Sequence, residues 1–181
     1  EIQLRAGHDG TGKGVALLVG PEPDVHWRTF TSAVVDLARE LGVQMMLGLG
    51  AFPAPVPHTR PTRLASTATS AELATQVGFV PGTIEVPAGI QAALEEAFGH
   101  AGIPAVGLWA RVPHYAAAMP YPAAAAALIE GLVTVGGLSL SAGDLHAAAD
   151  RTRAPIDEII ANREEHTATV PKLEPPVDAT D

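Results

Sequence analysis

The sequence predicts an α/β fold, and two observations support this prediction. Short runs rich in valine, leucine and alanine alternate with amphipathic stretches along the chain, which is the pattern of strands alternating with helices. Residues 43–51 (VQMMLGLGA) are apolar on both faces, as expected for a central parallel strand that helices cover on each side. The most economical architecture is a three-layer α/β/α sandwich.

The bulk composition limits the class of protein. The chain has 181 residues, of which 47% are hydrophobic, enough for one domain with a sizeable core. Its formal net charge of −9 argues against a nucleic-acid or anionic-membrane partner, because phosphate binding needs clustered lysine and arginine. The absence of cysteine excludes disulfides and fits a reducing, cytoplasmic compartment. No apolar run reaches the roughly 18 uninterrupted residues of a membrane span.

Residues 1–5 and 14–20 are predicted to form the two strands of a hairpin. The intervening GTGKG segment (10–14) has the glycine content of a phosphate-binding loop, but such a loop leads from a strand into a helix. Here a β-branched apolar run follows it. We therefore interpret the segment as a hairpin loop.

A first helix is predicted after this hairpin. Asp24 is the expected N-cap, since its carboxylate can accept the free amide hydrogens of the first turn. Gly42 is placed to end the helix in the left-handed conformation. Together with the strand at 43–51, this arrangement suggests a right-handed crossover unit. The predicted apolar face of the helix consists of Phe30, Val34, Leu37, Ala38 and Leu41.

The middle of the chain continues the alternation. The predicted elements are a strand at 63–69, a helix from Ser70 as cap through Val77, a turn-rich connection at 78–87, an amphipathic helix at 90–101 closed by Gly102, and a strand at 105–111. Glu95 and Glu96 lie on the second of these helices. Adjacent helical residues point about 100° apart, so we assign this pair to a solvated face.

The C-terminal third is predicted to be helical. Pro122 can open a helix over 123–135 that carries only Glu130 as a charge, so this helix is expected to be buried on two sides, either in the core or between subunits. Ser141 and Asp144 suggest the start of a short helix at 144–149, and Pro155 the start of a last one. We expect a single domain over 1–166 and a peripheral tail, rich in proline and acidic residues, over 167–181.

Functional side chains are expected where two strands run into Val-Pro-His. His58 and Arg60 follow the first strand, and His114 and Tyr115 follow the second. At the carboxyl ends of strands they could line a pocket, with an imidazole as base and the planar Arg60 fork as anion holder. Alternatively, the two histidines only bind backbone carbonyls in loops whose prolines donate no hydrogen. No zinc motif, nucleophile elbow or G-x-G-x-x-G is present, so we assign no catalytic residue, metal or cofactor.

Several of these segments resemble a known family. GPEPDVHW (20–27), VPHTRP (56–61), residues 101–129 and IDEII (156–160) are similar to the proteasome assembly chaperone 2 family in its bacterial branch. The resemblance implies an α/β/α fold similar to purine nucleoside phosphorylases, assembled as trimers or larger rings, and binding of proteasome α subunits by chaperone members. It also implies that a preceding Gly-rich segment is absent here. The chain ends VDATD, without the hydrophobic-Tyr-any tail of many such chaperones.

Two functions follow as hypotheses. The first is a non-enzymatic interaction or assembly module, with proteasome subunits as partners by resemblance. The alternative is an enzyme or a nucleoside- or nucleotide-like ligand binder that uses the pocket at the strand ends. Because the helix at 123–135 exposes apolar surface on more than one side, we also expect a homo-oligomer, a trimer by resemblance, with Trp109, Tyr121 or Leu132 near the contact.

Overall fold

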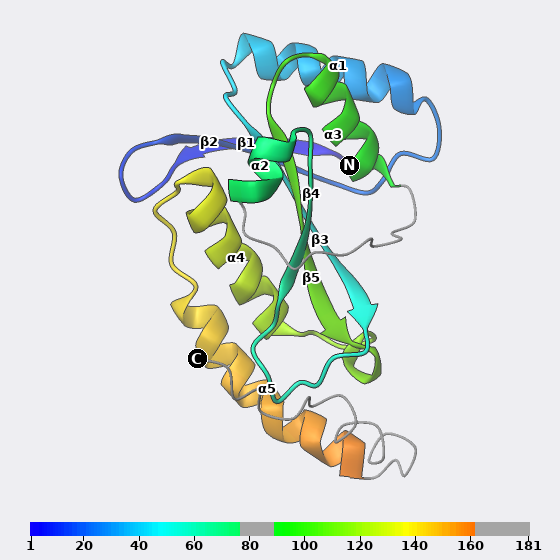
Figure 1. The fold of residues 1–181 in the computed structure, drawn as a ribbon, viewed down its shortest axis with the longest axis vertical. Coiled ribbons are helices and arrows are strands. Elements are labelled where there is room, and N and C mark those ends of the chain that lie inside the picture. The colour runs from blue at the N-terminus through cyan, green and yellow to red at the C-terminus, as the bar shows by residue number, and fades with distance from the viewer. Residues whose placement is uncertain (77–88, 162–181) are drawn as a thin grey trace.

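The computed structural model describes residues 1–76 and 89–161 (Figure 1). The predicted connection at 78–87 and the predicted tail at 167–181 lie outside the described residues. In chain order, the elements are β1 (Gln3–His8), β2 (Gly14–Val19), α1 (Trp27–Glu40), β3 (Met46–Ala54), β4 (Leu64–Ala68), α2 (Ala71–Gln76), α3 (Ile90–His100), β5 (Ala105–Pro113), the short 3-10 helix η1 (His114–Ala116), α4 (Pro122–Gly136) and α5 (Gly143–Ala161).

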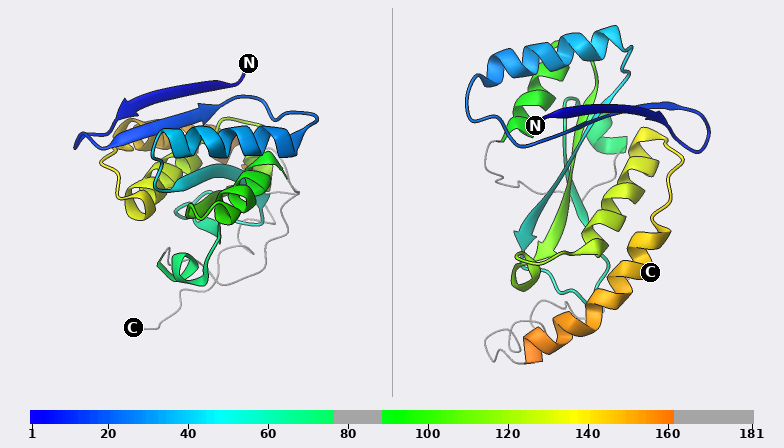
Figure 2. Two further views of the ribbon diagram at one scale, coloured as in Figure 1. Left: turned by 90° about the horizontal axis from the view of Figure 1, so that it is seen from above. Right: turned by 180° about the vertical axis from the view of Figure 1, so that it is seen from behind.

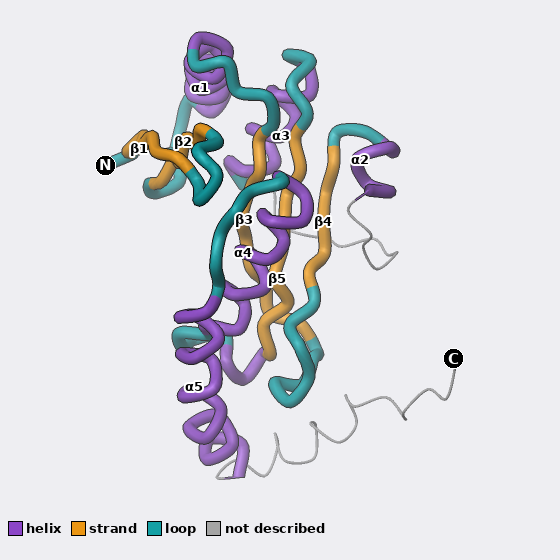
Figure 3. The backbone as a smooth tube through the Cα atoms, turned by 90° about the vertical axis from the view of Figure 1, so that its left-hand side faces the viewer, coloured by secondary structure: helices purple, strands orange, loops and turns teal. Residues whose placement is uncertain are grey.

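A three-stranded sheet runs through the middle of the described structure in the order β3-β5-β4 (Figure 3). β3 is parallel to β5, with Met46 opposite Ala105, and β4 is antiparallel to β5. The prediction that residues 43–51 form the central strand is wrong, because β5 lies between the other two strands. β5 is also the most completely buried of the three strands.

Helices cover both faces of this sheet, so the predicted α/β fold with three layers is confirmed (Figures 1 and 3). Alternation along β5 explains the layering, since successive side chains of a strand point to opposite faces. Ala105 packs against α1 and α3, whereas Val106 and Leu108 pack against α4. β3 is apolar on both faces for the same reason: Met46 faces α3 and Leu47 faces α4.

β1 and β2 form an antiparallel hairpin outside the three-stranded sheet (Figure 2). The GTGKG segment lies at the turn of this hairpin, which confirms its interpretation as a hairpin loop. Because β2 and β3 belong to different sheets, the predicted crossover unit from residues 14–20 to 43–51 is not formed.

The Asp9 carboxylate fixes the hairpin loop to the segment between α4 and α5. It accepts hydrogen bonds from the Thr11 amide and hydroxyl (both 2.8 Å), the Lys13 amide (2.9 Å) and the Ser139 amide (2.8 Å). The Lys13 ammonium donates to the Gly136 carbonyl at 2.7 Å. These hydrogen bonds, the one from Ser139 foremost, hold the pKa of Asp9 far below its usual value. The loop thus anchors the hairpin.

The start of α1 differs from the prediction. The N-cap is His26, whose backbone is left-handed (φ 61°), and not Asp24. The Trp27 indole N–H donates to the Pro23 carbonyl at 2.5 Å. The first residue of α1 thus holds the turn that precedes the helix. Gly42 does adopt the predicted left-handed conformation after the helix (φ 67°).

The buried face of α1 is rotated from the predicted one. Thr31, Val35 and Ala38 are the buried residues, whereas Leu37 and Leu41 are 37% and 53% exposed. The predicted apolar face holds only in part: Phe30, Val34 and Ala38 belong to the cluster that α1 forms with α3, whereas Leu37 and Leu41 do not.

α5 is one continuous helix with Pro155 inside it, so the two separate helices predicted for this region are a single element. The Ser141 hydroxyl accepts the Gly143 amide at 3.3 Å and caps its start, as expected. Pro155 has no amide hydrogen, so α5 lacks one backbone hydrogen bond there. Packing of the second half compensates for this loss, since Ile156 and Ile160 are buried.

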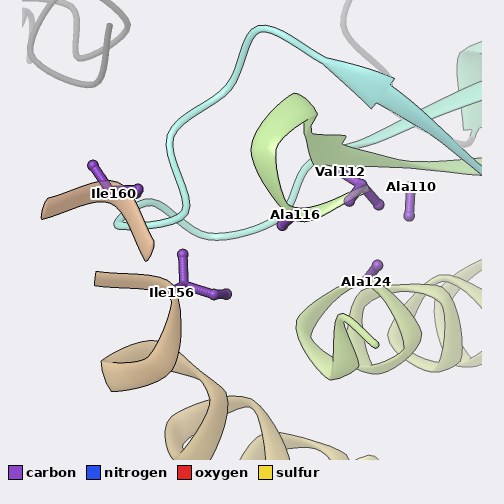
Figure 4. Close-up of a cluster of buried hydrophobic side chains, with 6 residues drawn as sticks. All are labelled: Ala110, Val112, Ala116, Ala124, Ile156 and Ile160. Carbon is purple, nitrogen blue, oxygen red and sulfur yellow. The ribbon is translucent and has the colours of Figure 1, made fainter. Parts of the chain in front are cut away.

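That packing forms a cluster below the strand ends. Figure 4 shows Ile156 and Ile160 reaching from α5 towards η1 and the end of β5. α4 begins at Pro122 as predicted and packs both on β5 and on α5, which confirms that it is buried on two sides. The cluster consists of Ala110, Val112, Ala116, Ala124, Ile156 and Ile160.

Glu95 is buried, which corrects its assignment to a solvated face; Glu96 is exposed as expected. The Thr67 hydroxyl donates to its carboxylate at 2.5 Å, and the Gln91 amide donates at 3.2 Å. Gly107 makes the room, since a side chain there would collide with Glu95 and Thr67. The helical pattern of α3 could not show that a glycine on a later strand leaves space for a carboxylate.

Candidate functional site: a polar pocket beside the strand ends

β3 and β5 bring the two Val-Pro-His segments to the same edge of the sheet. Their parallel register places Ala54 opposite Pro113, so both strands end side by side. His58 follows β3 in the loop to β4, and His114 opens η1 directly after β5. The predicted convergence of the two strand ends is confirmed.

His58 is enclosed, with a side chain that is 3% exposed, and it connects two segments distant in sequence. The Tyr115 hydroxyl accepts the His58 amide hydrogen at 2.9 Å and lies 3.0 Å from Nδ1. On the other side of the ring, Nε2 lies 2.7 Å from Oδ1 of Asp157 on α5. The Tyr115 and His58 rings meet edge to face, with centroids 5.7 Å apart. We call these three residues the His58 clasp.

The partners of His58 fix its tautomer. A carboxylate only accepts hydrogen bonds, so we assign the ring proton to Nε2, which donates to Asp157. Nδ1 then accepts from the Tyr115 hydroxyl. Both ring nitrogens are thereby engaged, and the clasp ties the β3–β4 loop and η1 to the second half of α5. This arrangement favours a structural role for His58 over that of a general base.

The other two predicted site residues lie apart from the clasp. Arg60 is exposed and lines a pocket next to it, to which His58 also contributes. His114 is exposed at the start of η1 and is not among the residues that line the pocket. The structure therefore groups His58 with Tyr115, and Arg60 with the pocket, and leaves His114 in neither group.

The pocket has a volume of about 390 Å³ and lies between the β3–β4 loop, α4 and α5. We call it the α4–α5 pocket. Such a volume is within the usual range of ligand sites, about 300–1,000 Å³. Its apolar residues are Pro61, Ala123, Ala127, Ala149 and Ile156, and its charged or imidazole residues are His58, Arg60, Glu130, His146, Asp150 and Arg153.

Polar contacts connect the walls of the α4–α5 pocket. His146 on α5 lies 2.7 Å from the Glu130 carboxylate on α4, and Arg153 donates to the Thr59 carbonyl at 3.2 Å. Burial raises the pKa of Tyr121, which also lines the pocket, and the charge of Arg153 opposes that rise.

The three predicted interface residues occupy different environments. Leu132 on α4 packs against Val106 and Leu108, in the core of the subunit. Trp109 is half-buried with its ring over Gly50 of the neighbouring strand. Tyr121 is half-buried in the pocket wall. A role in subunit contacts stays a prediction for these three residues, each of which is half-buried.

Large apolar side chains are exposed on the hairpin instead. Ile2, Leu4, Leu17 and Val19 are 39% to 49% exposed. The strand register puts Leu4 beside Leu18 and Leu17 beside Arg5, so both faces of the hairpin carry exposed apolar residues. We call these four residues the apolar hairpin surface. Sequence analysis did not predict this surface, because a strand pattern does not reveal whether another layer covers the strand.

Asp157 and the pocket residues of α4 and α5 are the functional candidates that sequence reasoning missed. Asp157 lies almost 100 positions after His58, in a region predicted to begin a new helix at Pro155. In the described ranges 1–76 and 89–161, no group of three or more histidine, aspartate or glutamate side chains is arranged to hold a metal ion. No helix within the same ranges is both long and apolar enough to cross a membrane.

The layered α/β/α sheet, the hairpin and the Val-Pro-His strand ends together define a class of fold that known proteins share. The sequence profile of the PAC2 family matches residues 1–160. The chain therefore belongs to the PAC2 family. A search among curated proteins finds no match.

Solved structures agree with this assignment. A Mycobacterium tuberculosis protein of unknown function is 38% identical with a TM-score of 0.86, over 95% of this chain and 58% of that one. A proteasome-assembly chaperone homologue from the same organism is 35% identical with a TM-score of 0.84, over 93% of this chain and 72% of that one. A Streptomyces avermitilis PAC2 family protein is 32% identical with a TM-score of 0.81, over 93% of this chain and 71% of that one. The chain thus spans only part of the length of these relatives.

Proposed function

We propose that this chain is a protein-interaction module that assists the assembly of a larger complex in the cytoplasm, with proteasome α subunits as its partners. The observation that supports this function best is the 35% identity to a proteasome-assembly chaperone homologue over 93% of the chain. It favours an assembly role over the nucleoside-binding alternative.

The apolar hairpin surface is consistent with such a role. Its four large side chains are exposed on a hairpin whose loop Asp9 connects to the segment between α4 and α5 by hydrogen bonds. Exposed apolar side chains that gather on one element commonly mark a contact with another protein. A hairpin anchored in this way also loses less conformational entropy when a partner binds.

Self-association is the second part of this proposal. A homo-oligomer, with a trimer as the first expectation, would use apolar surface of the same kind. Light scattering over a range of protein concentrations measures the mass directly. A mass that stays at that of one chain at every concentration would rule out the oligomer.

The partner is tested with purified proteasome α subunits and surface-immobilised protein. Leu17→Lys should weaken binding at least tenfold, because it places a charge in a contact that excludes water. Leu41→Lys is the matched control, since Leu41 is 53% exposed on α1 and does not belong to the hairpin. If the unmodified protein does not bind α subunits, the proposed partner is wrong. If both variants bind equally well, the hairpin face that carries Leu17 and Val19 is not the contact.

A further inference from the structure

The α4–α5 pocket has two arginines that have no carboxylate partner among residues 1–76 and 89–161. Arg60 is exposed and forms no ion pair in the described parts of the chain. Within the described part of the chain, Arg153 donates one hydrogen bond, to the Thr59 carbonyl, and its other N–H groups have no partner there. They reach the pocket from different walls, one from the β3–β4 loop and one from α5.

The acidic side chains nearby are mostly engaged. Glu130 is bound by His146, and Asp157, just outside the pocket, is bound by His58. Asp150 is the carboxylate of the pocket wall that has no such partner among the described residues. Two uncompensated positive charges therefore face one uncompensated negative charge, on a chain whose net charge is −9. This local excess favours a single negative charge in the pocket.

The remaining wall is apolar and made of small side chains. Ala123 and Ala127 on α4 face the same space as Ala149 and Ile156 on α5. Alanine at these positions leaves room between two helices that otherwise pack together. The pocket therefore offers guanidinium groups next to an apolar recess.

We infer that the α4–α5 pocket binds the C-terminal end of a protein chain, with its carboxylate on Arg60 and Arg153 and its last apolar side chain on the alanines. The planar guanidinium fork matches a carboxylate. The apolar recess beside the two arginines favours a carboxylate that carries an apolar side chain over inorganic phosphate, which has no apolar part to bury. Backbone N–H groups of the bound chain would supply donors for Asp150. The inference rests on the proposed function, because it names the part of a partner that is bound.

Small probes test this site in the whole protein by NMR titration of the ¹⁵N-labelled chain. The probe is acetyl-Gly-Ala-Leu with a free carboxylate, compared with the same peptide ending in an amide and with inorganic phosphate. We expect the acid to shift the amide signals of Thr59, Arg60 and Arg153, and the amide-ended peptide to bind about tenfold more weakly or worse.

Two variants and one control locate the binding. Arg60→Gln and Arg153→Gln should each weaken binding of the free-acid peptide about tenfold, because each removes charge-assisted hydrogen bonds. Arg63→Gln removes a positive charge three positions from Arg60, but Arg63 does not line the pocket. This variant should therefore bind the free-acid peptide as tightly as the unmodified protein does. All three arginines are exposed, so the variants should keep the native melting temperature.

The inference is overturned if the acid and amide peptides bind equally, if neither shifts these signals at millimolar concentration, or if phosphate binds more tightly than the acid. Its failure is separable from that of the proposed function. Binding of α subunits without binding of the peptide would overturn this site alone. Binding of the peptide without binding of α subunits would leave the site in place and remove the proposed partner.

Discussion

Replacing His58 by alanine should destabilise the protein measurably, because the His58 clasp joins three segments that are distant in the sequence. The variant loses the hydrogen bond between Nδ1 and the Tyr115 hydroxyl, worth about 1 kcal/mol. It loses the contact with Asp157, whose side chain is 60% exposed, so solvent reduces that contribution to about 0.5 kcal/mol. It also leaves space where an imidazole that is 3% exposed had packed, which costs about 1 kcal/mol more.

The free energy of unfolding should therefore fall by about 2–3 kcal/mol, which lowers the melting temperature of a chain of this size by about 4–12 °C. Urea unfolding followed by circular dichroism measures the loss. His114→Ala is the matched control: it belongs to the second Val-Pro-His segment but is exposed, so it should change the free energy by no more than about 0.5 kcal/mol. Equal effects of the two substitutions would refute the clasp.

A double-mutant cycle identifies the partner that carries the effect. Tyr115→Phe keeps the ring and removes only the hydroxyl, and it should cost about 1 kcal/mol. The distances indicate that His58 and Tyr115 are coupled. The double variant should therefore lose less free energy of unfolding than the two single variants together, and the difference should be at least about 0.5 kcal/mol, as for other contacting pairs. Strict additivity would show that the two side chains act independently.

Three further predictions follow from other contacts. Gly107→Ala should destabilise the protein by about 1–3 kcal/mol in thermal unfolding, because the new methyl group collides with the buried Glu95 carboxylate; an unchanged melting temperature would contradict the close packing. Leu132→Asp should unfold the subunit, and a folded monomer in gel filtration and circular dichroism would instead place Leu132 at an interface. The lowered pKa of Asp9 adds stability above the unfolded-state pKa of about 4, and this contribution is lost as the pH falls below that value. Asp9→Asn should therefore be less stable than the unmodified protein at pH 7, and this difference in the free energy of unfolding should shrink as the pH falls to 3. A difference that does not change with pH would contradict the lowered pKa of Asp9.

Local signals in the sequence were sufficient for most elements. The hairpin loop, the left-handed Gly42 and the start of α4 at Pro122 each depend on a few neighbouring residues, and each was predicted. The position of β3 in the sheet and the burial of Glu95 depend on residues far away in the chain, and both were predicted wrongly. A periodic pattern states which face of an element is apolar, but not which other element covers it.

The candidate site shows the same division. The meeting of two strand ends followed from the parallel arrangement, so His58 and Tyr115 were correctly placed at one edge. Asp157 was missed because its approach depends on how far α5 continues past Pro155. A proline usually ends or starts a helix, and only the buried isoleucines that follow it explain why this one does not.

The strand order β3-β5-β4 has a consequence for how the chain acquires its structure. β3 and β4 leave a ribosome before β5, yet they do not pair with each other, because β5 lies between them. The parallel partners of β3 and β5 are about 60 residues apart in the chain, so closing that loop costs entropy before any contact is gained. The hairpin, whose strands are adjacent in sequence, can form much sooner. A nascent chain that ends before β5 thus carries β3 and β4 with unpaired edges and without the three-stranded sheet, and this interval is when the protein is most exposed to aggregation.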